Sequence, residues 1–169
     1  MSSGPIYKVK FRRRRESKTN YRKRLGLLKS KKDRLVVRKS NNSTICEIVT
    51  YKPEGDKIRA HFTTSSLKKF GWKGHTGNIP AAYLAGYVCA KKAIKEKVGE
   101  AVLDLGLVTP VHGGRIFSAL KGAIDAGLNI PADEKVFPKD NRISGKHISE
   151  ETEKNFAETK NNIDKELGE

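Results

Sequence analysis

Between residues 34 and 64, hydrophobic and polar positions follow one another in three short stretches that are rich in β-branched residues. Residues 34–39 and 44–51 are separated by the turn-forming run Ser-Asn-Asn-Ser, and the run Pro-Glu-Gly-Asp precedes residues 57–64. Connections this short join neighbouring strands that run antiparallel, so the pattern predicts a three-stranded meander. The third stretch alternates cleanly, and its apolar side chains are expected on one face: Ile58, Ala60 and Phe62.

After the third stretch, the spacing of apolar residues changes to the period of a helix. Asn78 is a suitable cap for a helix that runs to about Val98. The apolar run at residues 101–105 follows this helix and predicts a strand that joins the sheet in parallel. A second helix is predicted over residues 113–126, with Gly127 as its stop. The pattern therefore predicts an α/β fold, in which helices flank a mixed sheet made of the antiparallel meander and one parallel strand.

The two ends of the chain differ from this central domain, which we delimit as residues 34–148. Residues 1–33 contain too few apolar residues for a core of their own, so we expect an extended basic arm with a short helix at about residues 20–30. Residues 149–169 are predicted to form an acidic helical tail. The narrow apolar stripe of that helix consists of Phe156 and Ile163.

Positive charge is concentrated in the arm. The protein has a formal net charge of +16, and ten of the seventeen residues from 8 to 24 are Lys or Arg. Like charges at this density repel one another and cannot be buried without partners, so the segment requires a polyanion. Arginine suits phosphate because its planar guanidinium donates to two oxygens at once. The charge pattern favours nucleic acid as the partner, with a disordered, solvated tail as the alternative.

Aromatic residues accompany these cations. Tyr7, Phe11 and Tyr21 are suited to stacking on exposed bases, which favours RNA. A membrane partner is not expected, because no apolar run approaches the roughly 20 residues of a spanning helix. The arm also has too few apolar residues for an apolar helix face.

A glycine-rich loop at residues 70–78 is the second candidate for a contact with RNA. It lacks the Lys-Ser or Lys-Thr pair of a Walker motif and the spacing of a dinucleotide site. Its glycines would let the backbone approach an RNA strand closely, and it carries Trp72, Lys73 and His75. An ordinary connecting loop is the alternative, and the loop alone does not decide between the two.

Residues that would support catalysis or metal binding are sparse. The four histidines are scattered, and Cys46 and Cys89 are expected to be reduced thiols. A nucleic-acid-processing enzyme that holds a divalent metal through Asp104 and Glu47 is an alternative hypothesis, but two-metal nucleases need several converging carboxylates. We therefore predict no enzymatic activity, no metal site, no cofactor and no small-molecule substrate.

Several segments occur in an order that is typical of one family. They read YKVKFRRRRE at residues 7–16, RLVVRKSN at residues 34–41, KFGWKG at residues 69–74, AVLDL at residues 101–105 and FSALKGA at residues 117–123. Over about residues 5–148, the chain resembles the large-subunit ribosomal proteins that bind 5S ribosomal RNA, numbered eighteen in bacteria and five in eukaryotes. Its arginine-rich opening and its length are similar to those of the archaeal members.

The resemblance implies a fold related to the ribonuclease-H-like motif and a structural role in the cytoplasmic ribosome. It implies that such a protein anchors 5S rRNA to 23S rRNA in the central protuberance, beside neighbouring large-subunit proteins. A DNA-architectural protein is the remaining alternative from another class. Residues 42–43 and 112–114 match none of the family's motifs, so no contacts are expected there.

The expected RNA contacts are of two kinds. Charge and resemblance both indicate the contacts of the arm, and the resemblance implies those of the central domain. They are Lys8, Lys10, Phe11, Arg12, Arg13, Arg14, Arg15, Lys18, Tyr21, Arg22, Lys23, Arg24, Arg38, Lys39, Ser40, Asn41, Lys69, Trp72, Lys73, Gly74, Thr76 and Asn78.

Overall fold

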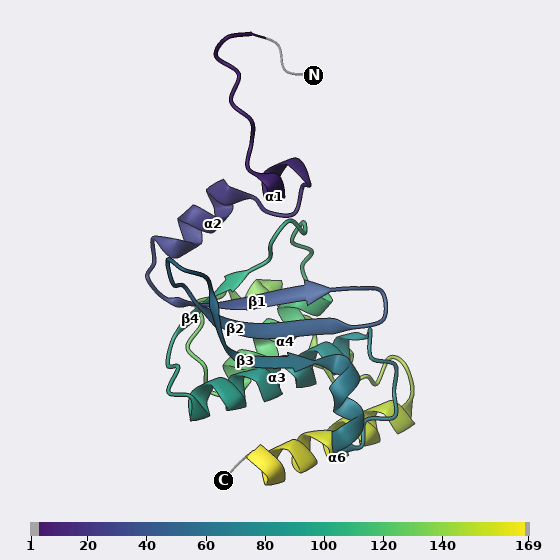
Figure 1. Ribbon diagram of the computed structural model, residues 1–169. Helices are drawn as coiled ribbons and strands as arrows, with labels where there is room; N and C mark the ends of the chain where they lie inside the picture. Colours follow the sequence, from purple (N-terminus) through teal and green to yellow (C-terminus); the bar gives the residue numbers. More distant parts are fainter. Residues whose placement is uncertain (1–3, 168–169) are drawn as a thin grey trace.

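Helices and strands follow one another along the chain largely as the sequence predicts (Figure 1). The structure is a computed structural model that describes residues 4–167. Two of its elements, η1 and η2, are short 3₁₀ helices. The elements are α1 (Arg12–Arg15), α2 (Tyr21–Leu28), β1 (Asp33–Lys39), β2 (Thr44–Thr50), β3 (Lys57–Thr63), η1 (Thr64–Phe70), α3 (Ile79–Lys95), β4 (Ala101–Asp104), α4 (Arg115–Asp125), η2 (Glu134–Val136), α5 (Asp140–Ile143) and α6 (Glu150–Leu167).

A four-stranded sheet with the order β3-β2-β1-β4 forms the centre of the fold. β2 pairs antiparallel with both β1 and β3, and β4 pairs in parallel with β1, which confirms the predicted mixed sheet. Helices α3 and α4 cover one face of this sheet (Figure 1). The core lies between the two layers, where side chains such as Leu35, Ile48 and Leu84 are fully buried. Removing this apolar surface from water is the main favourable term in folding.

A β-bulge at the edge of the sheet corrects one sequence prediction. Ala60 pairs with Ile48, but the register then shifts so that Ile58 pairs with Val49. A bulge adds one residue to one strand, so side chains beyond it change face. Ile58 is 52 % exposed, whereas Ala60 and Phe62 are buried in the core. The prediction that these three side chains share a face is therefore wrong for Ile58.

The two predicted central helices are confirmed as α3 and α4. The Asn78 side chain accepts a hydrogen bond of 2.9 Å from a backbone N–H in the first turn of α3, as a helix cap does. The two helices touch backbone to backbone, because a Cβ atom at Gly86 would collide with the Ala119 carbonyl and one at Gly122 with the Tyr83 carbonyl. The Ser118 hydroxyl of α4 donates to the Ile79 carbonyl of α3 at 2.8 Å, so the first turns of the two helices lie side by side.

The two ends of the chain take different positions relative to the central domain (Figure 1). Residues 4–11 of the N-terminal arm extend away from it, whereas α2, at the predicted place, lies over the sheet. The prediction of extended chain is wrong for residues 12–15, which form the single turn α1 that an Arg12–Glu16 pair supports at i,i+4 spacing. The predicted C-terminal helix is confirmed as α6, which packs on α3 and η1 with Ile163 fully buried.

Candidate nucleic-acid interface

The arm presents its cations to solvent. All side chains of residues 4–18 are exposed, and the Phe11 and Tyr21 rings lie with their centroids 5.4 Å apart beside the arginine run. Glu16 pairs with Lys18 at 2.9 Å and lies 3.8 Å from Arg12. Several other cations of the arm have no carboxylate partner within residues 4–167 and are free to bind phosphate. They include Lys8, Lys10, Arg14, Arg15, Arg22 and Lys23.

A chain of ion pairs connects α2 to the sheet. Arg24 donates to Asp56 at 2.8 Å, and the same carboxylate accepts from Arg34 at 2.6 Å. Arg34 also donates to Asp104 at 2.9 Å, and Arg38 donates to Asp104 at 3.1 Å. Arg34 is only 3 % exposed, so its guanidinium requires these carboxylates. We call these five residues the arm network, and its alternating charges hold α2 over the sheet.

Asp56 is the carboxylate that joins the arm to the central domain. Burial raises the pKa of Asp56, but hydrogen bonds from Arg24 and Arg34 outweigh burial and lower this pKa below its usual value. Asp56 is therefore ionised at neutral pH, as its two ion pairs require.

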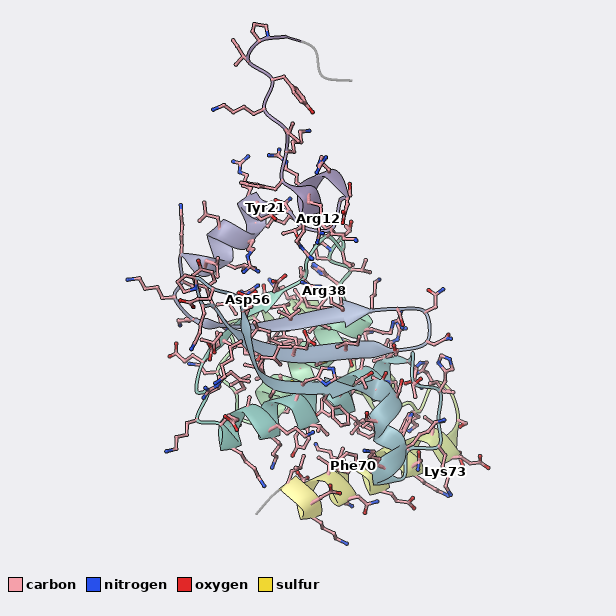
Figure 2. All side chains as sticks on the ribbon, in the orientation of Figure 1. Arg12, Tyr21, Arg38, Asp56, Phe70 and Lys73 are labelled. Atoms are coloured by element: carbon pink, nitrogen blue, oxygen red, sulfur yellow. The ribbon has the colours of Figure 1, made fainter. Side chains whose placement is uncertain are left out.

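A cavity of about 680 Å³ lies between the arm and the face of the sheet that α3 and α4 leave uncovered. Its floor contains the apolar side chains Val36, Val49 and Ile58. Figure 2 shows Arg38 and Asp56 on the sheet side of this region, with Tyr21 and Arg12 on the arm side. Cations outnumber carboxylates in its lining, which contains Arg13, Lys18, Lys23, Arg24, Arg34 and Arg38 against Glu47, Asp56 and Asp104.

This arm cavity has the chemistry of a nucleotide site. An apolar floor suits the face of a base, and a cationic rim suits its phosphate. A volume in the range of small-molecule sites accommodates unstacked nucleotides rather than a double helix.

The tip of the β1–β2 hairpin and the glycine-rich loop form a second surface, which we call the platform (residues 39–43 and 69–78). The Thr76 hydroxyl donates to the Asn42 carbonyl at 2.6 Å and ties the two segments together. The segments touch at Gly77, where a Cβ atom would lie 2.5 Å from a carbonyl oxygen of the hairpin. Glycine is needed at this position because no larger residue permits such a close backbone approach.

Arg115, at the start of α4, bonds to both parts of the platform. Its guanidinium donates to the carbonyls of Ser40 and Gly77, at 2.9 Å each, and to that of Asn41 at 3.5 Å. The carbonyl oxygens of both segments are thus turned toward an arginine that α4 holds in place. The platform also carries the exposed cations Lys39, Lys69 and Lys73.

Several predicted contact residues of the loop have internal roles instead. Trp72 is 3 % exposed, and its Nε1 donates to the His75 carbonyl at 3.4 Å. Gly74 packs on the indole, since a Cβ atom there would lie 2.7 Å from a ring carbon. The Asn78 side chain is occupied as the cap of α3, and Thr76 bonds to the hairpin. Burial removes the Trp72 ring from the predicted contacts with RNA.

The arm and the platform are not brought together. Tyr21 and Arg12 lie at one end of the molecule in Figure 2, and Lys73 lies at the other. The predicted contact residues therefore divide between two separate basic surfaces. Sequence reasoning does not single out Asp56 or Arg115, because ion pairs and carbonyl contacts between distant segments leave no periodic signal in the chain.

Asp104, one of the two carboxylates of the enzyme hypothesis, is engaged elsewhere. Asp104 accepts hydrogen bonds from Arg34, from Arg38 and from the Gly106 N–H, the last at 2.8 Å. A carboxylate with two arginine partners is a poor ligand for a divalent cation, because it is already neutralised. Among residues 4–167, no three His, Cys, Asp or Glu side chains gather where they could share a metal ion.

The cysteines and the helices bear on two other sequence predictions. Cys46 and Cys89 are buried and form no disulfide. Burial raises the pKa of Cys46, and burial raises the pKa of Cys89 to about 12, so both thiols stay protonated at neutral pH. None of the helices within residues 4–167 combines the length and the apolar character that crossing a bilayer requires.

A comparison with known protein families identifies the family of the chain. The sequence model of a family described as ribosomal large subunit proteins 60S L5 and 50S L18 matches residues 6–101 and 95–133. The match includes the arm from residue 6, all four strands, the platform, and α3 and α4, whereas α5 and α6 lie beyond it. The resemblance inferred from the sequence is thereby confirmed, and the chain belongs to the family of ribosomal large-subunit proteins 60S L5 and 50S L18.

Proposed function

We propose that the protein binds 5S rRNA through its arm and anchors it to 23S rRNA in the central protuberance of the large ribosomal subunit. Membership of the family establishes a structural role in that subunit. The observation that carries the finer proposal is the arm itself, with unpaired cations held over an uncovered sheet face by the arm network. Two separate basic surfaces on one protein suit a molecule that connects two RNA segments.

The arm and the arm cavity supply the proposed contact with 5S rRNA. Arginines neutralise phosphates, and a single-stranded nucleotide enters between α2 and the sheet so that its base lies on the apolar floor. Lys8, Lys10 and the arginine run bind the adjoining backbone. The contact is therefore mainly electrostatic, with a smaller contribution from base burial.

The platform supplies the proposed contact with 23S rRNA. Lys39, Lys69 and Lys73 bind phosphates, while Ser40, Asn41 and the glycine-rich backbone approach the strand closely. Because Arg115 already satisfies the carbonyls beneath, the exposed groups of the platform keep their positions before RNA arrives.

The remaining features of the proposal concern the setting of the protein. We place it in the cytoplasm, in an archaeal-type ribosome, beside neighbouring large-subunit proteins of the central protuberance. We also propose that its sheet and flanking helices correspond to the ribonuclease-H-like motif, without the catalytic function. The neutralisation of Asp104 by two arginines supports a binding role over hydrolysis.

Deleting residues 1–24 tests the function directly. We expect 5S rRNA affinity to fall by about a hundredfold or more near physiological salt, because most phosphate contacts are lost. The slope of log affinity against log salt should flatten by roughly 0.7 to 0.9 for each contact removed. Circular dichroism on both proteins reports whether the central domain remains folded, and an unchanged slope would contradict the proposal.

Two charge variants distinguish an effect of where the cations lie from an effect of the total charge. Changing Arg14 and Arg15 to Gln removes two cations of the arm, and changing Lys95 and Lys97 to Gln removes two exposed cations at the end of α3. We expect only the first pair to weaken binding of 5S rRNA. Equal losses, or displacement of the RNA by duplex DNA at similar concentrations, would indicate non-specific binding instead.

A further inference from the structure

Helix α6 contacts the platform with polar side chains rather than with an apolar face alone. The Asn155 side chain accepts from the Lys73 N–H at 3.0 Å and donates to the Gly71 carbonyl at 3.0 Å. Asn162 donates to the Phe70 carbonyl at 3.0 Å. Two turns of one helix thus bond to the backbone of the loop at three points. Side-chain bonds to a loop backbone fix its path whatever the loop side chains do.

These bonds satisfy loop groups that lack other backbone partners. Within residues 4–167, neither the Lys73 N–H nor the Gly71 carbonyl bonds to another backbone group. Gly71 has a φ of +90°, a left-handed conformation that glycine adopts readily and that the chain leaves equally readily without support. Asn155 therefore holds the turn that leads directly into Lys73.

Helix α6 is itself held firmly enough to act as a support. Ile163 and Thr159 are fully buried, and the Phe156 ring lies 5.5 Å from that of Tyr83. The Tyr87 hydroxyl donates to Asp164 at 2.6 Å. Burial, together with this hydrogen bond, raises the pKa of Tyr87 to about 12, so the hydroxyl keeps its proton. The helix is anchored along α3, and its asparagines face the loop from a fixed position.

We propose that α6 is a positioning element for RNA binding by the platform, and that Asn155 and Asn162 are its positioning residues. This inference rests on the proposed function of the platform and deepens it. The helix needs no contact with RNA, because it acts by holding Lys69 and Lys73 in the conformation that binds. A loop with three glycines would otherwise have to be ordered during binding, at a cost in affinity.

Single substitutions in the full-length protein test this proposal, with Asn161→Ala as the matched control. Asn161 is an exposed neighbour on the same helix, and no hydrogen bond of its side chain occurs within residues 4–167. The test variants are Asn155→Ala and Asn162→Ala. A further variant, Asn155→Asp, retains an acceptor for the Lys73 N–H but loses the donor to the Gly71 carbonyl.

The first measurement is independent of RNA. Hydrogen exchange at the Lys73 amide should accelerate at least tenfold in Asn155→Ala, less in Asn155→Asp, and not in the control. Tryptic cleavage after Lys69 and Lys73 should follow the same order. An exchange rate in Asn155→Ala equal to that of the control would overturn the proposal, because α6 would then not protect the Lys73 amide from exchange.

The second measurement is binding of a transcript of the central-protuberance region of 23S rRNA. We expect affinity to fall roughly fivefold to thirtyfold in the Asn155→Ala and Asn162→Ala variants, with a flatter salt slope. A merely stabilising helix would leave both quantities unchanged well below the melting temperature. Faster exchange with unchanged RNA affinity would therefore overturn the positioning role.

Failure of this inference is distinguishable from failure of the proposed function. The asparagine variants leave the arm intact, so binding of 5S rRNA should stay at the wild-type value in each of them. Loss of 5S rRNA binding in these variants would mean that α6 supports the whole domain and not the platform, and would also overturn the inference.

Discussion

The arm and the platform present similar cations by opposite physical means. In the arm, exposed side chains stand on two short helices, and the ion pairs of Arg24 and Arg34 with Asp56 tie α2 to the sheet. In the platform, Gly77 touches the hairpin, Arg115 bonds to two carbonyls, and α6 bonds to the loop backbone. One surface is therefore organised by charge, and the other by backbone hydrogen bonds.

Charge and order are balanced differently in the two surfaces. A dense cationic segment cannot pack against itself, so its affinity is large, depends on salt, and includes the cost of ordering on binding. A pre-ordered surface needs fewer cations because it loses less entropy when RNA binds. Substitutions in each surface test this balance.

Ile58→Glu should have the largest effect, because it places a negative charge on the floor of the arm cavity. The carboxylate would replace the apolar contact with a base and repel the phosphates at the cationic rim, at a cost on the order of 1–4 kcal/mol, so affinity for 5S rRNA should fall about tenfold or more. Ile45→Glu is the matched control, since Ile45 is also an exposed isoleucine of the sheet but does not line the cavity. Equal losses in the two variants, measured by filter binding, would remove the cavity from the interface.

Gly77→Ala should disrupt the platform without touching the arm. The added Cβ atom would lie 2.5 Å from the Asn41 carbonyl oxygen, and overpacking of this kind costs about 1–3 kcal/mol. Gly99→Ala is the control, because a Cβ atom at Gly99 meets nothing within 4 Å. Urea denaturation should show a loss for the first variant and none for the second. Wild-type stability in Gly77→Ala would show that the hairpin and the loop separate freely.

Asp56→Asn should loosen α2 by removing the carboxylate that Arg24 and Arg34 share. Leaving a buried arginine with fewer partners costs about 1–3 kcal/mol, which urea denaturation detects. The pKa of Asp56 is lower in the folded than in the unfolded protein, where it is about 3.9. Its stabilising contribution is therefore complete above about pH 4 and is lost as the pH falls through the folded value.

The pH dependence supplies the check on this explanation. The difference in stability between wild type and Asp56→Asn should be constant near neutral pH and should shrink as the solution becomes more acidic than about pH 4. A difference that persists unchanged at low pH would mean that the carboxylate charge is not what holds α2.

The sequence predicted the elements because their signals are local. The cap at Asn78, the stop at Gly127 and the turn residues of the meander each depend on neighbouring residues, and all correspond to observed boundaries or pairings. Distant contacts produce no such signals. The bulge that turns Ile58 outward depends on pairing with β2, and the burial of Trp72 depends on how the whole loop folds back.

The candidate site was predictable in part for the same reason. Composition identifies the arm, since charge density is a local property of the chain. The division into two surfaces and the roles of Asp56, Arg115 and Asn155 arise only when segments far apart in sequence meet. Sequence patterns are therefore least able to predict residues that order an interface without contacting its ligand.

Gly26→Ala is the smallest expected effect and the sharpest test of the comparison. Gly26 lies inside α2, and a Cβ atom there meets nothing within 4 Å. At an exposed helical position, alanine stabilises the helix by about 0.5–1 kcal/mol relative to glycine. Helix α2 should therefore become more helical before RNA binds. If the arm loses entropy on binding, this pre-ordering should raise 5S rRNA affinity by roughly twofold to fivefold, with the salt slope unchanged because no charge is altered. An unchanged affinity in a more helical arm, measured by circular dichroism and filter binding, would mean that the arm is already as ordered as the platform.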